Sequence, residues 1–162
     1  MRAILLVFLV PFFQGKAQSA LDRKIAAAMK TLSCPRPNEA SPVMLNAALV
    51  VAGDSIGVIV KVELAPGWHI YDYVPSTLPY IPIDTILRLP GDLRAVGAWI
   101  KSVSSSSAMD PGVLIFENEA VFIHKVIRAA PGGGKIQTGL YYQTCNVRQC
   151  LPPVEKTIDL IF

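Results

Sequence analysis

The segment YYQTCNVRQCLPP, residues 141–153, contains two cysteines, Cys145 and Cys150, with four residues between them. Such a pair can form a structural disulfide, contribute to a metal site or cycle between dithiol and disulfide. A disulfide here would close a ring of only six residues, for which the loss of chain entropy on unfolding gives roughly 2 kcal/mol. A domain of about 145 residues already buries a substantial core. The short ring therefore favours an exchangeable bond, with a structural disulfide as the alternative.

Redox chemistry at this pair requires a thiolate, because the thiolate is the attacking species in disulfide exchange. A nearby cation lowers the pKa of a thiol, and Arg148 is the only charged residue in the segment 141–153. We expect Arg148 to line the site, with a solvated loop arginine as the alternative. Exchange would run through a mixed disulfide with a partner, which the second cysteine then resolves.

Metal binding is the third interpretation of the cysteine pair. A closed zinc site usually takes four ligands in two closely spaced pairs, whereas this chain offers one cysteine pair with His69 and His124. A copper site that uses both cysteines and Met109 would suit soft ligands. The spacing does not require it, and we expect neither a metal nor an organic cofactor.

The first 17 residues have the composition of a secretory signal peptide. Arg2 precedes the apolar run AILLVFLVPFF, and small residues stand at Gly15 and Ala17. The run is shorter than the roughly 20 apolar residues that a transmembrane helix needs. We therefore expect a periplasmic or secreted protein, in a compartment where disulfides persist.

The charge of the exported chain is close to balanced. The full sequence has 15 basic and 12 acidic residues, a net charge of +3. Removal of residues 1–17 takes away Arg2 and Lys16, which leaves 13 basic against 12 acidic residues, a net charge of +1. A nucleic-acid-binding surface is not indicated by this balance, and no later segment has the length of a membrane span.

The remainder of the sequence predicts an all-β domain after a short lead-in. Residues 18–41 have helical composition followed by a proline-rich stretch, and we interpret them as a helical or flexible lead-in. Residues 42–162 contain short β-branched and aromatic runs bounded by turn formers, which is typical of an antiparallel sandwich. We expect eight or nine strands and almost no helix.

Several strand pairings follow from the positions of the turns. VMLNAALVVA and IGVIVKVELA flank Gly53-Asp54, which predicts a hairpin. VLIFEN and AVFIHKVI are predicted to pair across a turn near Asn118. The run AVFIHKVIR, residues 120–128, has apolar residues on both faces, which predicts burial on both sides of part of this strand.

Three segments together resemble a known family: GWHIY (67–71), VLIFENEAVF (113–122) and LYYQTCNVRQCLPPVEKTIDL (140–160). They are similar to the amino-terminal, immunoglobulin-like domain of the thiol:disulfide interchange protein DsbD, over residues 42–162. The resemblance implies an immunoglobulin-like β-sandwich that passes electrons between thioredoxin-fold proteins. It also implies that Cys145 and Cys150 are the redox pair and that Cys150 forms the mixed disulfides.

The resemblance further implies residues that line the site. Tyr71 takes the position of the last tyrosine in the family's glycine-plus-aromatics strand, and His69 stands where that strand often has another aromatic residue. The family covers its disulfide with a loop that carries an aromatic and acidic residues. The matching loop here is SSSSAMDPG, residues 104–112, in which Met109 and Asp110 are the closest counterparts. It has no aromatic residue, but a methionine can shield a sulfur by soft packing.

The sequence thus predicts an exported thiol:disulfide exchange module of the protein-disulfide reductase type. Its alternative is a non-enzymatic binding or assembly module in which the same disulfide is structural. With three cysteines, one is left outside the pair. We interpret that residue, Cys34, as a free thiol in a mobile segment.

Overall fold

A computed structural model of the chain describes residues 19–130 and 132–162; the predicted signal peptide lies outside these residues. The described part contains one α-helix and eleven β-strands, two of them only two residues long. The elements are α1 (Ala20–Thr31), β1 (Val43–Ala52), β2 (Ser55–Leu64), β3 (His69–Tyr73), β4 (Asp84–Arg88), β5 (Leu93–Lys101), β6 (Ser105–Ser106), β7 (Leu114–Glu117), β8 (Glu119–Arg128), β9 (Lys135–Tyr142), β10 (Thr144–Cys145) and β11 (Val154–Ile161).

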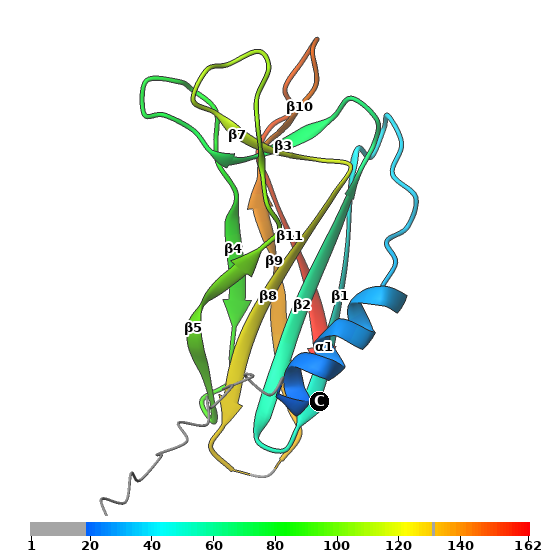
Figure 1. The fold of residues 1–162 in the computed structure, drawn as a ribbon, viewed down its shortest axis with the longest axis vertical. Coiled ribbons are helices and arrows are strands. Elements are labelled where there is room, and N and C mark those ends of the chain that lie inside the picture. Colours follow the sequence, from blue (N-terminus) through cyan, green and yellow to red (C-terminus); the bar gives the residue numbers. More distant parts are fainter. Residues whose placement is uncertain (1–18, 131) are drawn as a thin grey trace, which may run out of the picture.

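The strands form three antiparallel sheets. Two long sheets, in the orders β1-β2-β8-β5 and β11-β9-β4, make up the body of the molecule. A third sheet of short strands, in the order β10-β3-β7-β6, lies at one end, at the top of Figure 1. The prediction of an all-β, immunoglobulin-like sandwich is confirmed.

The core is formed by side chains from the inner faces of the sheets, as expected for a sandwich. Val60 and Phe122 of the first sheet pack in one cluster with Leu140 and Tyr142 of β9. A second cluster further along the same strands contains Val126 and residues from β2, β9 and β5. Burial of these side chains contributes about 1.5–3 kcal/mol each relative to their exposure, so the body of the sandwich supports the short sheet at its end.

The predicted β1–β2 hairpin is confirmed. The two strands pair from Val43 with Leu64 to Ala52 with Ser55. Gly53 in the turn has a φ of +63°, a conformation that glycine adopts without a steric penalty. Strands β9 and β11, which flank the cysteine segment, also pair along their whole length.

The predicted pairing of residues 113–118 with residues 120–127 is wrong. Strand β7 pairs with β3 and β6, whereas β8 pairs with β2 and β5. The two strands are joined at Asn118, whose φ of +61° is left-handed, and its carbonyl accepts a hydrogen bond from the Leu64 N–H at 2.8 Å. This conformation carries the chain from one sheet into another, so the short connection is a corner and not a hairpin turn.

Strand β8 is covered on both sides over much of its length, as its apolar pattern predicts. Phe122, His124 and Val126 are buried on the inner side. On the outer side, Val121 and Ile123 join the cluster in which α1 packs through its buried residues, Leu21 and Ile25. An ion pair of 2.7 Å between Asp22 and Lys125 adds a polar contact at the start of α1.

Cys34 lies in the segment between α1 and β1. It is a free thiol, as interpreted from the sequence. Its surroundings differ from those of a mobile segment, because its Sγ lies 3.3 Å from the Lys61 carbonyl oxygen and its N–H donates to Glu63 at 3.4 Å. Burial, with the nearby Glu63 carboxylate, raises the pKa of this thiol, which disfavours the reactive thiolate.

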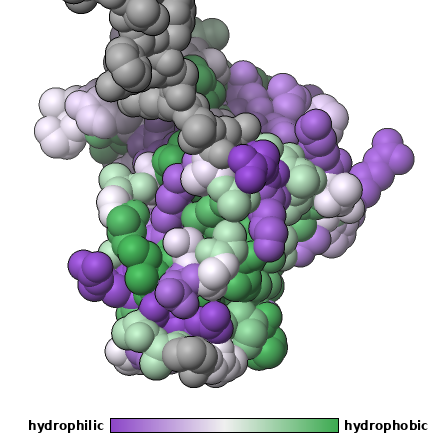
Figure 2. Space-filling view, turned by 60° about the horizontal axis from the view of Figure 1, so that its bottom comes forward, coloured by the Kyte–Doolittle hydropathy of each residue, from purple (hydrophilic) through white to green (hydrophobic). Residues whose placement is uncertain are grey.

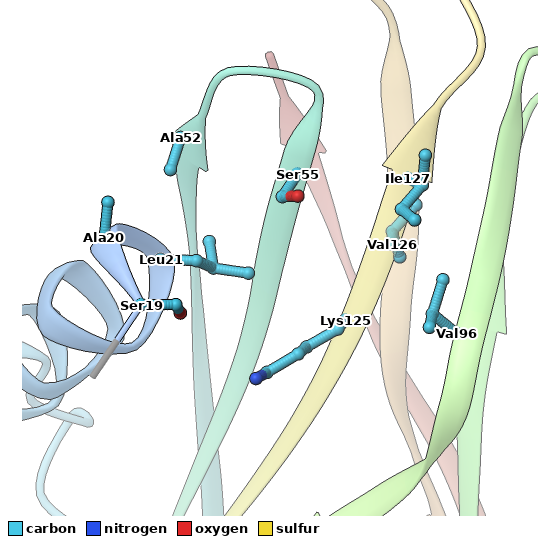
Figure 3. Close-up of a pocket in the computed structure, with 9 residues that line it drawn as sticks. All are labelled: Ser19, Ala20, Leu21, Ala52, Ser55, Val96, Lys125, Val126 and Ile127. Carbon is cyan, nitrogen blue, oxygen red and sulfur yellow. The ribbon is translucent and has the colours of Figure 1, made fainter. Parts of the chain in front are cut away.

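A surface cavity of about 340 Å³ is lined by the start of α1, the turn end of the β1–β2 hairpin, and strands β8 and β5. Lys125 extends from β8 toward the helix across it, and Val96 faces it from β5 (Figure 3). When the bottom of Figure 1 is turned forward, hydrophobic and hydrophilic residues are intermixed on the visible surface (Figure 2). Among the described residues, no helix is long and apolar enough to cross a membrane.

We predict that Gly139→Ala destabilises the sandwich by about 1–3 kcal/mol through overpacking. A Cβ at this position of β9 would lie 2.8 Å from the Cα of Thr157 and closer still to the Lys156 carbonyl oxygen of β11. Urea unfolding measures the change. Gly91→Ala is the matched control, because nothing lies within 4 Å of an added Cβ there. Equal unfolding midpoints for the two variants would contradict the close approach of β9 and β11.

Candidate redox site

The short sheet at the end of the sandwich has two different faces. Ile70 of β3 and Phe116 of β7 are paired residues and both belong to the main core. The alternate residues of β3 point the other way. Tyr71 packs there in a separate cluster with Ile115 and Cys145. One face of the sheet is thus anchored in the sandwich and the other carries the cysteine site.

Strand β10 brings the cysteine segment to the edge of β3. Cys145 is the cross-strand partner of His69, and His69 is in turn paired with Glu117 of β7. The Thr144 hydroxyl donates a hydrogen bond of 2.9 Å to the His69 carbonyl oxygen, which fixes the pairing from the opposite face. Directly paired residues have their side chains on the same side of a sheet, so Cys145, His69 and Glu117 form a row.

Cys145 and Cys150 are joined in a disulfide, with their Cα atoms 4.0 Å apart. They form an antiparallel bridge at the base of a tight turn, residues 146–149. The Asn146 side-chain oxygen accepts hydrogen bonds of 2.9 Å from the N–H groups of Arg148 and Gln149. The turn is therefore built by local hydrogen bonds.

The two cysteines differ in exposure. Cys145 exposes only 2% of its surface and packs against Tyr71, Val113 and Ile115. Cys150 is exposed on the outer arm of the turn. An incoming thiolate can therefore approach Cys150, whereas the protein covers Cys145.

Tyr71 is held from both sides at the floor of the site. Its ring stacks on that of Tyr80, with ring centroids 4.8 Å apart and an interplanar angle of 8°. Burial, helped by Tyr80 and by the negative charge of Asp110, raises the pKa of Tyr71 to about 12. The phenol is neutral at physiological pH and adds no charge beside the sulfurs.

His69 is half-buried and makes a T-shaped contact with Tyr71, with ring centroids 5.0 Å apart. Burial lowers the pKa of this imidazole, and the carboxylates of Glu117 and Asp110 act in the opposite direction. His69 stands where the resembling family often has an aromatic residue, so a titratable ring occupies this position here.

Met109 and Asp110 lie in the loop between β6 and β7. The Ser107 hydroxyl oxygen accepts the N–H groups of both residues, at 3.2 and 3.1 Å, and the Asp110 carbonyl accepts from Val113 at 3.2 Å. The charge of Asp110 acts on His69 and Tyr71. Met109 is 64% exposed and is not a member of the buried cluster around Cys145.

Arg148 lies on the exposed turn between the two cysteines. It lines a surface cavity of about 320 Å³ together with Trp68 and Glu39. The indole N–H of Trp68 donates to the Glu39 carboxylate at 3.3 Å. The structure thus places Arg148 near a different set of residues from the one formed by Tyr71, His69 and Asp110.

Two residues of the site were not identified from the sequence, Tyr80 and Gln143. Gln143 accepts the Ile81 N–H at 3.0 Å through its side-chain oxygen, and the Tyr71 carbonyl accepts the Ile83 N–H at 2.7 Å. These bonds hold the segment of Tyr80 beside β3. The sequence signal was present, because an aromatic residue between two prolines, LPYIP, is typical of a fixed loop.

No group of three or more His, Cys, Asp and Glu side chains with the arrangement of a metal site occurs in residues 19–130 and 132–162. The donors near the disulfide are spread along a row of paired strands. What this arrangement can do chemically is thiol exchange, since it combines an accessible sulfur with a covered one.

Comparison with solved structures shows a shared fold. The N-terminal periplasmic domain of ScsB from Proteus mirabilis matches with a TM-score of 0.51 and 16% identity, over 78% of this chain and 49% of that one. The N-terminal domain of Neisseria meningitidis DsbD in the reduced form matches with a TM-score of 0.47 and 24% identity, over 82% and 91% of the two chains. No family model matches the sequence, and no curated protein does.

The chain has the fold of the N-terminal periplasmic domain of ScsB. It spans about half the length of that ScsB chain. The DsbD amino-terminal domain, which the sequence motifs resemble, is among the solved structures that match this chain. A complex of the DsbD and PilB N-terminal domains from Neisseria meningitidis also matches, with a TM-score of 0.43 and 21% identity over 71% of this chain and 80% of that one.

We predict that Tyr71→Ala lowers the free energy of unfolding by about 3–5 kcal/mol, as for other large buried aromatic residues. The substitution removes the ring that packs on both Tyr80 and Cys145. Urea unfolding of the oxidised protein provides the measurement. Tyr73→Ala serves as the control, since Tyr73 on the same strand is 54% exposed and should change stability by less than about 0.5 kcal/mol. Similar losses for both variants would refute the structural role of Tyr71.

Proposed function

We propose that the protein is a thiol:disulfide exchange module that cycles Cys145 and Cys150 between dithiol and disulfide. The observation that carries this proposal is the asymmetry of the pair. One cysteine is exposed on a short turn and the other is covered by the sheet. The two cysteines lie five positions apart in the sequence, and a structural disulfide over so short a ring would contribute only roughly 2 kcal/mol.

The asymmetry divides the roles of the two sulfurs. A partner thiolate attacks Cys150, because this residue is the accessible one. The electron pair of the broken S–S bond goes to Cys145, and a mixed disulfide links Cys150 to the partner. In the reverse direction Cys145 resolves the mixed disulfide by attack on the Cys150 sulfur.

The loop of Met109 and Asp110 is proposed to control access to the sulfurs. Asp110 places a negative charge where it acts on His69 and Tyr71. Met109, exposed at the tip of the loop, supplies a flexible apolar group that can pack on a sulfur or a partner. Arg148 is proposed to act on the exposed side of the turn, as a cation close in sequence to Cys150.

The proposed partners are thioredoxin-fold redox proteins, and the proposed location is the periplasm or the exterior of the cell. The signal-like composition of residues 1–17 and the fold shared with a periplasmic domain support this location. A disulfide of this kind can cycle only where oxidised and reduced partners coexist. No cofactor takes part, since both electrons are carried by the sulfur pair.

The reduction potential of the Cys145–Cys150 bond tests the proposed function. We expect a value above about −300 mV, because potentials below this mark structural disulfides that resist reduction. Equilibration of a Cys34→Ser variant with a dithiothreitol redox buffer, followed by alkylation of free thiols, gives the value. The Cys34 substitution removes the third thiol from the measurement. A potential below −300 mV would assign the bond a structural role and favour the binding module.

We predict that Cys145→Ala in the Cys34→Ser background accumulates mixed disulfides through Cys150. Without Cys145 the attack that releases the reduced partner cannot occur, and alkylation at the quench blocks the partner's second thiol from reversing the adduct. Incubation with an oxidised thioredoxin-fold protein, followed by non-reducing electrophoresis, detects the product. The matched variant, Cys150→Ala, retains only the covered cysteine and should give at most about one tenth as much adduct. The opposite ratio would reverse the two roles.

A further inference from the structure

The disulfide has a titratable neighbour on its covered side. His69 is the direct cross-strand partner of Cys145, which places their Cβ atoms about 4.5–5.5 Å apart on one face of the sheet. The imidazole ring makes a T-shaped contact with the ring of Tyr71, with ring centroids 5.0 Å apart. His124, the other histidine of the chain, lies on β8, where it is buried and contacts the ring of Trp99 of β5. It does not belong to the row of Cys145, His69 and Glu117.

Reduction of the disulfide places a negative charge on the buried Cys145 sulfur. When a thiolate attacks Cys150, the leaving group is Cys145. Its sulfur then carries a negative charge among Tyr71, Val113 and Ile115. Burial in apolar surroundings disfavours a thiolate, and Tyr71, with its pKa of about 12, is a weak acid. A proton supplied at Cys145 would remove the charge as the bond breaks.

We propose that His69 is the proton-transfer partner of Cys145 in disulfide exchange. This inference rests on the proposed exchange function and assigns its proton step. In the direction of reduction, the partner thiolate forms a bond with the Cys150 sulfur, the S–S bond breaks, and the electron pair goes to Cys145. The imidazolium of His69 gives its proton to that sulfur and becomes neutral imidazole. In the reverse direction the neutral ring takes the proton from Cys145 as this thiol attacks the mixed disulfide.

The charged groups around the ring suit a histidine that changes its protonation state. Glu117 faces it from β7 and Asp110 from the loop between β6 and β7, while Tyr71 on β3 and Cys145 on β10 are neutral neighbours. Burial favours the neutral ring and lowers the pKa of His69, while the two carboxylates act in the opposite direction and stabilise the imidazolium. Because these influences oppose each other, the ring can both give and take a proton.

The test is the pH dependence of disulfide reduction by dithiothreitol in the Cys34→Ser background. Rate constants are divided by the concentration of the dithiothreitol thiolate, so that only the protein's own titration remains. The pKa of His69 lies below the ordinary value of 6.5. The imidazolium form therefore accumulates as the pH falls below 6.5. We expect the normalised rate constant to rise between pH 7 and about pH 5 in the parent protein. His69→Gln should lose this rise and react at least about tenfold more slowly at pH 5, with a ratio near one at pH 8.

His69→Phe separates proton transfer from packing, because it keeps an aromatic ring against Tyr71 but cannot carry the proton. It should behave like His69→Gln. His124→Gln is the matched control and should keep the parent profile. Coincident profiles for the parent, His69→Gln and His69→Phe would overturn the proposal, and a parent-like profile for His69→Phe alone would reduce His69 to a packing role. Near-ultraviolet circular dichroism verifies that each variant is folded.

The outcome is independent of the test of the exchange function. If the reduction potential is that of a labile bond while all pH profiles coincide, the exchange function stands and the role of His69 falls. If the potential is that of a structural disulfide, the exchange function itself falls. A labile potential together with a lost pH dependence in both His69 variants supports both.

Discussion

The candidate site depends on one constraint, the alternation of side chains along β3. In a strand, successive residues point to opposite faces. Ile70 is therefore buried in the main core, while His69 and Tyr71 face the disulfide. Because β3 pairs with β10 on one side and β7 on the other, the same alternation aligns Cys145 and Glu117 with His69. Core burial on one face fixes the register of the chemistry on the other.

The electrostatic character of the site follows from this geometry. The covered sulfur is surrounded by apolar side chains and a neutral phenol, so a charge that forms there is poorly solvated. The carboxylates of Glu117 and Asp110 act on the histidine. The exposed cysteine lies on a turn that Asn146 stabilises locally. The exposure of Cys150 therefore removes no side chain from the sandwich core.

Much of the fold was predictable from local patterns. The β1–β2 hairpin follows from two β-branched runs around Gly53-Asp54, and the two-sided burial of β8 follows from its apolar residues on both faces. The placement of β7 and β8 in different sheets was not predictable in this way. A turn signal such as Asn118 is the same whether the chain folds back on itself or turns a corner into another sheet. Only the partners that β3 and β2 offer to the two strands decide between these outcomes.

The candidate site, like the fold, was predictable from the sequence only in part. The sequence by itself determined that two cysteines lie on a short turn, that a glycine-plus-aromatics strand accompanies them, and that the domain is a β-sandwich, because spacing and alternation are local properties. Only the tertiary structure decided that Cys145 is covered while Cys150 is exposed, that Tyr80 stacks on Tyr71, and that His69 stands opposite Cys145. The pairing of β10 with β3 joins segments that lie 75 residues apart at the Thr144–His69 hydrogen bond. Cross-strand register depends on which side chains the core buries, so neither segment determines it alone.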